Sequence, residues 1–152
     1  MARTSIYLNF MGQTEEAFSF YKQVFGTEFI APFQRMSEVP ADPNQQTLSD
    51  DEQNLIMHVE LPILGGLVLM GTDMLESMEH KLIAGNNVSL NLEPDTRTET
   101  DELFKALSGG GEVIEPLQEM FWGGYFGSCI DKFGVRWMFN CANEELAGDQ
   151  QP

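Results

Sequence analysis

Two histidines and one neighbouring carboxylate are the first groups in this 152-residue chain whose types and spacing could do chemistry. Apolar and polar residues alternate along 54–61, which is typical of a strand, and His58 and Glu60 fall on the same face of it. An imidazole beside a carboxylate could act as a general base with its partner, or could bind a metal ion. A polar pair that is simply hydrogen-bonded on a half-exposed strand is the alternative interpretation.

The remaining reactive side chains favour structural roles. His80 lies in the polar segment 76–81 and is expected to be solvated, and Cys129 has no basic neighbour in sequence that would activate it as a nucleophile. Cys129 and Cys141 flank a predicted hairpin turn at 131–134. Its register would pair Cys129 near Arg136 and leave Cys141 about 16 Å away, so we expect two free thiols.

Five aromatic residues occur close together near the end of the chain. Two interpretations are open: these residues form core and dimer contacts, or one or two of them stack on a flat or apolar ligand at a cavity mouth. Trp122, which precedes Gly123 and Gly124, is the strongest candidate for stacking. The five residues are Phe121, Trp122, Tyr125, Trp137 and Phe139.

Alternating and helical patterns indicate the elements that would position these groups. A strand is predicted over 5–11, followed by a helix that Thr14 would cap and that Gly26 would end. The polar segment 37–53 is predicted to be a long loop, either a lid or an insertion without function. Two further strands, 54–61 and 67–71, are predicted to form a hairpin through a turn at 64–66.

The same order of elements occurs twice. Leu8-Asn9-Phe10 is echoed by Leu90-Asn91-Leu92, and a second helix precedes the triple glycine Gly109–Gly111. The predicted strands after each helix are 28–33, 54–61 and 67–71 in the first copy, and 112–115, 121–130 and 135–141 in the second. We therefore predict two βαβββ modules, about 5–72 and 87–141, within one domain of residues 1–142 followed by a flexible tail at 143–152.

Composition limits the classes of function. Lys and Arg number 8 against 24 Asp and Glu, a formal net charge of −16, which repels phosphate backbones and anionic lipid headgroups. We therefore expect no nucleic-acid and no membrane partner. The first residues do not resemble a secretory signal, so a soluble protein in the cytoplasm is expected.

Five segments carry a resemblance to a known family. YLNF at 7–10, EEAFSFYKQVFG at 15–26, MHVEL at 57–61, FWGGYFG at 121–127 and DKFGVRWMFNC at 131–141 resemble the PhnB-like branch of the vicinal oxygen chelate superfamily. This superfamily comprises the glyoxalases, bleomycin resistance proteins and dioxygenases. The resemblance implies an α+β fold in which two βαβββ modules form a strongly curved mixed sheet with helices outside. It also implies an internal cavity and a homodimer.

In such a fold the more polar side of each strand should line the cavity. We expect Tyr7, Asn9, His58, Asn91 and Trp122 to line one ligand pocket built from both modules, with the loop 37–53 able to cover it. The same rule selects Glu60, Val68, Met70, Thr72, Asn87, Ser89, Arg136, Met138 and Asn140 as inner-face residues. The negative charge of the chain favours a neutral or weakly charged aromatic ligand over a phosphate.

The resemblance also identifies where a metal would bind. Metal-dependent relatives place their ligands at four inner positions, which here correspond to Ile6 or Tyr7, Met70, Asn87 or Val88, and Met138. Thioether and amide groups are poor ligands for the usual divalent ions, so no standard metal centre and no cofactor are expected. Some PhnB-like sequences are described as demethylubiquinone methyltransferases, but the triple glycine follows a helix and fits a helix end better than a nucleotide-binding loop.

Three functions compete at this point. The first is a metal-free, homodimeric protein that binds a small organic molecule. The second is a metal-dependent enzyme of the glyoxalase or dioxygenase type, whose metal or catalytic groups would be His58, Glu60 and a residue of the dimer mate. The third is an interaction module without a ligand. Whether a reaction is catalysed, and on which compound, is open, because this superfamily hosts several chemistries on one fold.

Overall fold

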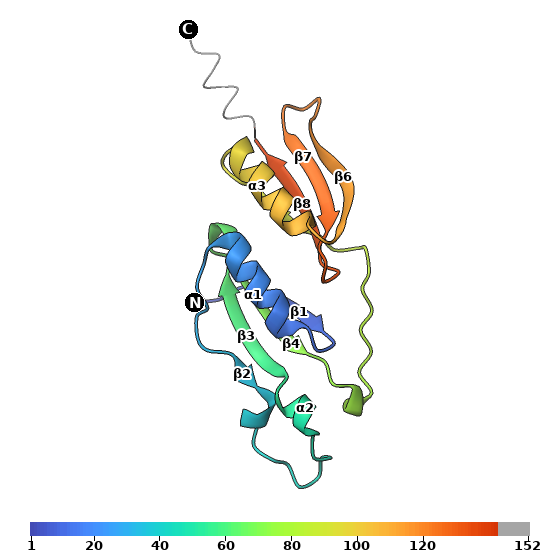
Figure 1. Ribbon diagram of the computed structural model, residues 1–152. Coiled ribbons are helices and arrows are strands. Elements are labelled where there is room, and N and C mark those ends of the chain that lie inside the picture. Colours follow the sequence, from blue (N-terminus) through green and yellow to red (C-terminus); the bar gives the residue numbers. More distant parts are fainter. Residues whose placement is uncertain (143–152) are drawn as a thin grey trace. The chain divides into compact units, whose positions relative to one another are not determined.

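The computed structural model describes residues 1–142, and the chain divides into two compact units, Met1–Ile83 and Ala84–Pro152. We call them the N-terminal and C-terminal units and describe each by itself. Each unit is built from one helix-covered sheet of four strands, in the orders β1-β4-β3-β2 and β5-β8-β7-β6 (Figure 1). The α+β class is therefore confirmed, with two mixed sheets that do not close on themselves.

The N-terminal unit has a parallel pair at one edge of its sheet. β1 runs parallel to β4, whereas β4 with β3, and β3 with β2, are antiparallel. Its strands and α-helices are β1 (Ile6–Phe10), α1 (Thr14–Phe25), β2 (Gln34–Arg35), α2 (Asp50–Gln53), β3 (Ile56–Pro62) and β4 (Val68–Asp73). Three 3-10 helices complete it: η1 (Met36–Glu38), η2 (Leu64–Gly66) and η3 (Glu76–Met78).

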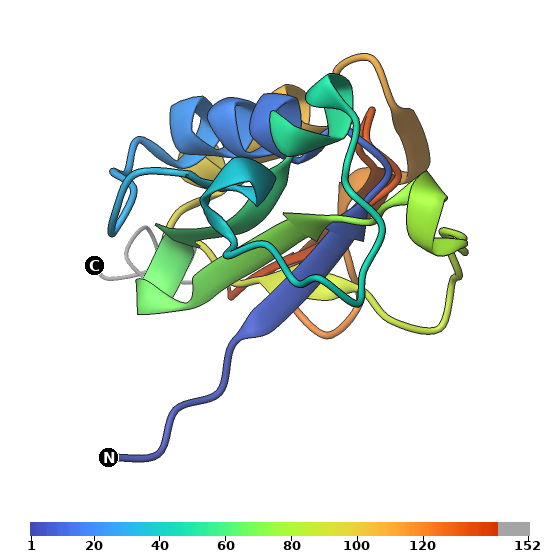
Figure 2. The ribbon, with the colours of Figure 1, turned by 90° about the horizontal axis from the view of Figure 1, so that it is seen from below.

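Helix α1 covers one face of this sheet, which leaves the other face for polar side chains (Figure 2). Phe18 and Tyr21 of α1 are fully buried against the sheet, where Leu61 and Leu69 are also fully buried. Gly71 is required at this contact, because a Cβ atom there would lie 2.4 Å from Cε2 of Phe18. The helix therefore packs closely on β4.

The C-terminal unit repeats the pattern with longer strands at its far edge. β5 runs parallel to β8, and β8, β7 and β6 follow in antiparallel order. Trp137 and Phe139 of β8 are fully buried in its core. The elements are β5 (Leu90–Leu92), α3 (Arg97–Ser108), β6 (Glu112–Glu119), β7 (Tyr125–Ile130) and β8 (Arg136–Cys141).

A buried carboxylate, Asp73, ties three segments of the N-terminal unit together. Its Oδ1 accepts hydrogen bonds from the Gly12 and Thr14 amides and, at 2.7 Å, from the Thr14 hydroxyl, while its Oδ2 accepts from the Ile56 amide. The prediction that Thr14 caps α1 is therefore wrong. The residue at the cap position is Gln13, and the Thr14 hydroxyl is buried against Asp73 instead. Gly26 does end the helix, with a left-handed φ of 64°.

Two strand predictions are also wrong. Residues 28–33 form no strand, and the second strand is the short β2 at Gln34–Arg35. Phe29 and Phe33 pack on each other instead, with ring centroids 4.7 Å apart. In the C-terminal unit, β6 continues to Glu119, and residues 121–124 form a turn rather than the start of a strand. Gly123, at a φ of 90°, makes that turn possible because positive φ favours glycine.

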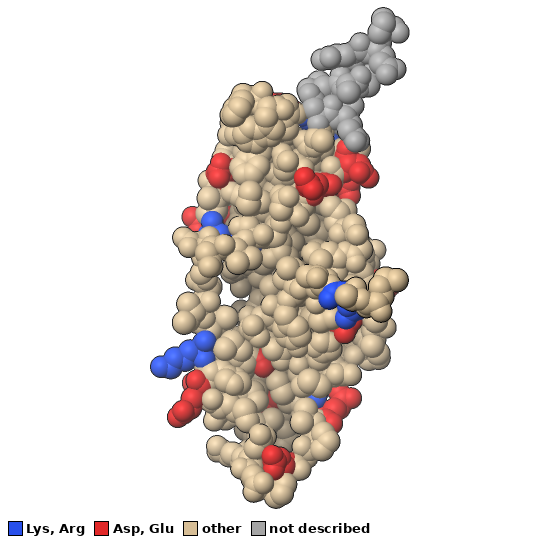
Figure 3. Space-filling model, turned by 180° about the vertical axis from the view of Figure 1, so that it is seen from behind, with Lys and Arg blue, Asp and Glu red and all other residues tan. Residues whose placement is uncertain are grey.

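Across the described residues 1–142, no helix combines the length and the apolar character needed to cross a membrane. On the face of the molecule drawn in Figure 3, charged side chains of both signs are scattered among uncharged ones. That face offers no continuous basic surface for a polyanion.

Candidate functional site

A chain of three hydrogen-bonded side chains lies on the polar face of the N-terminal sheet. The Tyr7 hydroxyl of β1 is 2.9 Å from Nδ1 of His58, and Nε2 of His58 is 3.0 Å from Oε1 of Glu60. Strand register produces this arrangement, because Tyr7 and Glu60 both pair with Met70 of the intervening strand β4. Arg3 adds an ion pair to Glu60 at 3.8 Å.

For a neutral His58 ring, the hydrogen-bond pattern decides which nitrogen carries the proton. A carboxylate can only accept, so neutral His58 carries its hydrogen on Nε2, and its Nδ1 then accepts the hydrogen of the Tyr7 hydroxyl. Burial, followed by the charge of Glu60, raises the pKa of Tyr7, so its hydroxyl keeps the proton at neutral pH. Tyr7 is 47% exposed, so its oxygen can accept a hydrogen bond from a molecule that docks on this face.

Asn9 lies two residues beyond Tyr7 on the same side of β1 and is exposed. Asn9 pairs with Thr72 of β4, as Tyr7 pairs with Met70. The inner-face residues that the sequence analysis selected on β1 and β4 therefore lie side by side on one face of the sheet. Tyr7, Asn9 and His58 are thus brought together in the N-terminal unit.

Asn91 and Trp122, the other two residues predicted for the pocket, belong to the C-terminal unit. Asn91 is exposed on β5 and pairs with Met138 of β8. Trp122 lies in the turn between β6 and β7, is 52% exposed, and packs edge-on against Phe121 and Phe126. A pocket shared by all five residues stays a prediction.

Arg97, which the sequence analysis missed, holds the Trp122 turn in place. Its guanidinium is paired with Glu119 at the end of β6 and also donates to the carbonyl oxygens of Gly123 and Ala142. These contacts join the two ends of the turn to the start of α3. The sequence offered no periodic signal for this clamp, because its partners lie 22 to 45 positions away.

The aromatic set divides between the two interpretations. Trp137 and Phe139 are fully buried core residues, whereas Phe121 and Trp122 are exposed. Tyr125 takes a third role, because its hydroxyl donates to Asp101 at 2.6 Å, and this hydrogen bond, followed by burial, raises its pKa to about 12.

Both cysteines and His80 occupy structural surroundings. Cys129 and Cys141 are free and buried, and burial, followed by the charge of Asp131, raises the pKa of Cys129 to about 12. This favours a packed thiol over a nucleophile. Cys129 pairs with Trp137, one residue beyond the predicted Arg136, because the hairpin closes through Asp131 and Val135. His80 is exposed as expected, yet its Nδ1 also accepts a hydrogen bond from the Leu75 amide.

The positions that correspond to metal ligands hold other types of side chain. Tyr7 and Met70 are direct cross-strand partners, and Met138 pairs with Asn91. Within residues 1–142, no group of three or more His, Cys, Asp or Glu side chains is arranged to hold a metal ion. None of the side chains at these positions supplies the imidazole or carboxylate groups that divalent ions favour. They are Ile6 or Tyr7, Met70, Asn87 or Val88, and Met138.

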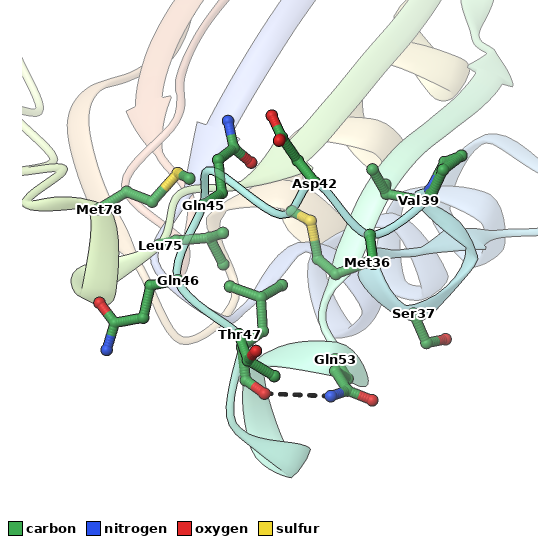
Figure 4. A pocket seen from close by; sticks show the side chains of 13 residues that line it. Met36, Ser37, Val39, Asp42, Gln45, Gln46, Thr47, Gln53, Leu75 and Met78 are labelled. Carbon is green, nitrogen blue, oxygen red and sulfur yellow. Dashed lines mark hydrogen bonds between the residues drawn. The ribbon is translucent and has the colours of Figure 1, made fainter.

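The loop 37–53, predicted to be either a lid or an insertion without function, contains the helix α2 and lines a pocket of its own in the N-terminal unit, with a volume of about 430 Å³ (Figure 4). The pocket shares no lining residue with the Tyr7–His58–Glu60 chain. The sequence analysis did not identify this pocket. One signal was available: residues 43–48 carry no charge within an otherwise acidic segment.

Comparison with protein families gives one match over most of the chain. A family model described as 3-demethylubiquinone-9 3-methyltransferase matches residues 2–139. Protein YjdN of Escherichia coli K12 is 27% identical over 145 residues, which cover 93% of this chain and 96% of that protein.

Solved structures agree with this match. A protein from Pseudomonas aeruginosa is 32% identical, with a TM-score of 0.78 over 93% of this chain and 98% of that one. A Bacillus cereus PhnB protein, described as a putative 3-demethylubiquinone-9 3-methyltransferase, is 26% identical, with a TM-score of 0.72 over 93% and 100% of the two chains. A Burkholderia phytofirmans enzyme of the glyoxalase/bleomycin resistance/dioxygenase family shares the fold at 20% identity, with a TM-score of 0.58 over 90% and 96%.

Proposed function

Because the chain belongs to the PhnB-like branch of the glyoxalase/bleomycin resistance/dioxygenase superfamily, we propose that it is a metal-free, homodimeric protein that binds a small organic molecule. The observation that carries this proposal is the half-exposed Tyr7 hydroxyl at the end of the Glu60–His58 hydrogen-bond chain. A polar group that is fixed in place yet open to solvent is typical of a binding site.

The chain orients Tyr7 before any ligand arrives. Glu60 fixes the tautomer and the ring of His58, and His58 in turn directs the Tyr7 hydrogen away from the ligand side. The Tyr7 oxygen is left to accept from an N–H or O–H of a ligand, and the Asn9 amide beside it can both donate and accept. Pre-ordered groups lose little conformational entropy on binding, which raises affinity.

The charges favour a neutral or weakly charged ligand. Glu60 lies directly behind His58, and the chain carries a formal net charge of −16, so a phosphate would meet repulsion here. Met70 lies between Tyr7 and Glu60 in the strand register and is buried, so the floor beneath these polar groups is apolar. A flat, mostly apolar molecule with one hydrogen-bond donor fits this chemistry.

The hydrogen bonds of His58 support the metal-free form of the proposal. A metal bound by His58 and Glu60, with a third ligand from a dimer mate, would have to displace Tyr7 from Nδ1 or Glu60 from Nε2. The displaced side chain would then need a new hydrogen-bond partner. Losing either of these hydrogen bonds costs on the order of 1 kcal/mol or more. The metal-dependent enzyme is therefore the alternative to be tested.

The name of the matched family describes a methyl transfer. The triple glycine at 109–111 does not support that function. Gly109–Gly111 follow the last residue of α3, and Gly110 adopts a φ of 74°. A Cβ atom on Gly111 would lie 2.1 Å from the Ile130 carbonyl oxygen. These glycines end a helix and allow close packing on β7, so they do not form a cofactor-binding loop.

The homodimer is supported by the edge of the C-terminal sheet. β6 is an edge strand, and Val113 and Ile114 on it are exposed, as are Phe121 and Trp122 in the turn that follows. Burying these apolar side chains against a second copy would stabilise the pair by roughly 25 cal/mol per Å² removed from water. The two free thiols fit the reducing conditions of the cytoplasm, where we propose that the protein acts.

Native mass spectrometry of freshly purified protein tests the proposal. We expect a dimer mass with a co-purified organic compound and no stoichiometric transition metal. Replacing Tyr7 with Phe should weaken the binding of that compound by about 0.5–1.5 kcal/mol, the usual contribution of one hydrogen bond. Tyr125→Phe is the matched control, because it removes a hydroxyl bonded to Asp101 in the other unit. One metal ion per chain that His58→Ala abolishes would overturn the metal-free proposal, and loss of an activity when that metal is removed would favour the alternative enzyme.

A further inference from the structure

The pocket beneath the loop of the N-terminal unit is lined by three segments of chain. One is η1 with the loop that follows it, the second is α2, and the third is the stretch of η3 and its preceding residue (Figure 4). Its lining residues are Met36, Ser37, Val39, Pro40, Ala41, Asp42, Gln45, Gln46, Thr47, Leu48, Gln53, Leu75 and Met78.

Hydrogen bonds hold the walls of this pocket. The backbone turns at Asp42, whose side chain accepts from the Asn44 amide and whose carbonyl accepts from the Gln45 amide. Gln53 of α2 donates to the Leu48 carbonyl oxygen at 3.0 Å, the contact drawn in Figure 4. The pocket is therefore largely formed in advance, which favours ligand binding because less chain must be ordered.

A further contact joins α2 to η3. The Ser77 amide donates to the Glu52 carboxylate at 3.3 Å, so the helix on one side of the pocket is tied to the segment on the other. The volume of about 430 Å³ lies within the range of about 300–1,000 Å³ that is usual for small-molecule sites.

The lining combines an apolar base with polar groups and one acid. Met36, Leu75 and Met78 contribute thioether and aliphatic surface, and methionine adapts its shape to a ligand more easily than branched residues do. Glutamine, serine and threonine side chains supply neutral donors and acceptors. Asp42 is the one ionisable residue among the 13 that line the pocket, and none of them is cationic.

The adjacent segments reinforce this negative charge. Helix α2 begins with Asp50, Asp51 and Glu52, and η3 begins with Glu76. The nearest basic side chain in sequence, Arg35, is paired with Glu15 at 2.5 Å. A positively charged group entering the pocket would therefore be attracted, and an anion would be repelled.

We propose that this pocket is a second binding site, separate from the Tyr7 site, for a small molecule with an apolar body and one protonated amine. The ammonium group pairs with Asp42, and the apolar body contacts Met36, Leu75 and Met78. The proposal is independent of the function assigned to Tyr7 and His58, because the two sites share no residue.

Three probes with the same ring system test the charge requirement. They are 1-naphthylmethylamine, which is protonated at pH 7, 1-naphthylmethanol, which is neutral, and 1-naphthylacetate, which is an anion. Their dissociation constants are measured by titration of full-length protein whose methionine methyl groups carry carbon-13, with Met36→Leu and Met78→Leu variants to assign the two resonances. Asp42 is exposed, and ion pairs with exposed carboxylates contribute at most about 1 kcal/mol. We therefore expect the amine to bind about fivefold more tightly than the alcohol, and the acetate most weakly.

Two variants separate the pocket from the general charge of the chain. Asp42→Asn should reduce the preference for amine over alcohol to about twofold or less. Asp50→Asn removes the same charge from α2 and should leave at least half of the preference that the unmodified protein shows. Tyr7→Phe should change none of the three constants. The proposal is overturned if the probes do not shift the Met36 and Met78 resonances, if all three bind equally, or if Asp50→Asn acts as strongly as Asp42→Asn.

Discussion

The two units use the same order of elements but connect their polar groups differently. In the N-terminal unit the contacts run between strands and across the exposed face of the sheet, as in the Tyr7–His58–Glu60 chain. In the C-terminal unit the contacts of Arg97 and Tyr125 lie around α3 and the strand ends. A repeated fold therefore does not repeat its chemistry, because the strand order positions a face without choosing its side chains.

The buried carboxylates show the same difference in range. Asp73 accepts hydrogen bonds from residues 17 to 61 positions away, whereas Asp131 accepts from Phe133, Val135 and Trp137, at most six positions away. Asp73 joins distant segments, and these three contacts of Asp131 close a hairpin. The hydrogen bonds of Asp73 therefore span a longer stretch of sequence than these three hydrogen bonds of Asp131.

Replacing each carboxylate with its amide should give the largest effect and the clearest contrast. Asp73→Asn turns an NH2 group toward a buried backbone amide and should cost about 2–4 kcal/mol of unfolding free energy, and Asp131→Asn about 1–3 kcal/mol. Denaturant unfolding of both variants measures the difference. The exposed Asp95→Asn is the control. Equal losses for the two buried sites would remove the distinction between long-range and local contacts.

The next largest difference in stability is expected where a closely packed glycine is replaced in each unit. Gly71→Ala would bring a Cβ atom 2.4 Å from the fully buried Phe18 ring, whereas Gly127→Ala first meets Cδ2 of Leu117, a half-buried side chain, at 2.8 Å. Overpacking should therefore cost about 2–3 kcal/mol at Gly71 and about 1 kcal/mol at Gly127. Thermal unfolding reports both, with the exposed Gly85→Ala as control. A smaller loss at Gly71 than at Gly127 would contradict the packing argument.

The pH dependence of stability should reveal how much the Tyr125 hydroxyl stabilises the C-terminal unit. The pKa of Tyr125 is raised from 10.0 to about 12, first by its hydrogen bond to Asp101, so the folded state favours the protonated phenol. This stabilisation is present below about pH 10 and is lost as the pH rises towards about 12. The difference in Tm between wild type and Tyr125→Phe should shrink across that window. A difference that is constant from pH 8 to pH 12 would show that the hydrogen bond does not contribute.

Trp122 should give the smallest change in stability. It is 52% exposed, whereas Trp137 is fully buried and donates to Asp131. Trp122→Ala is therefore expected to alter the unfolding free energy by no more than about 0.5 kcal/mol, as for other surface substitutions. If Trp122 stacks on the ligand, the same variant should weaken binding by about 1–3 kcal/mol, as for other anchor residues. A large fall in Tm with unchanged binding would make Trp122 a core residue.

Much of the fold could be predicted from local patterns. The alternation of residues 5–11 and 54–61 predicted β1 and β3, and it placed Tyr7 and His58 on polar faces. The repeat of the order strand, helix and three strands predicted two modules, and both sheets have that connectivity. Short-range periodicity carries this information because each side chain of a strand or helix has a fixed direction relative to its neighbours.

Contacts between distant residues could not be predicted in the same way. The sequence alone determined the two long helices α1 and α3, most strands and the acidic charge that disfavours polyanions, since these follow from neighbouring residues and composition. The tertiary structure decided that Thr14 bonds to Asp73 across 59 positions, and that the Tyr7 hydroxyl meets His58 across 51. It also decided that the loop after β2 forms a pocket with Leu75 and Met78. These pairings depend on strand register and on where buried donors find acceptors, which no local pattern specifies.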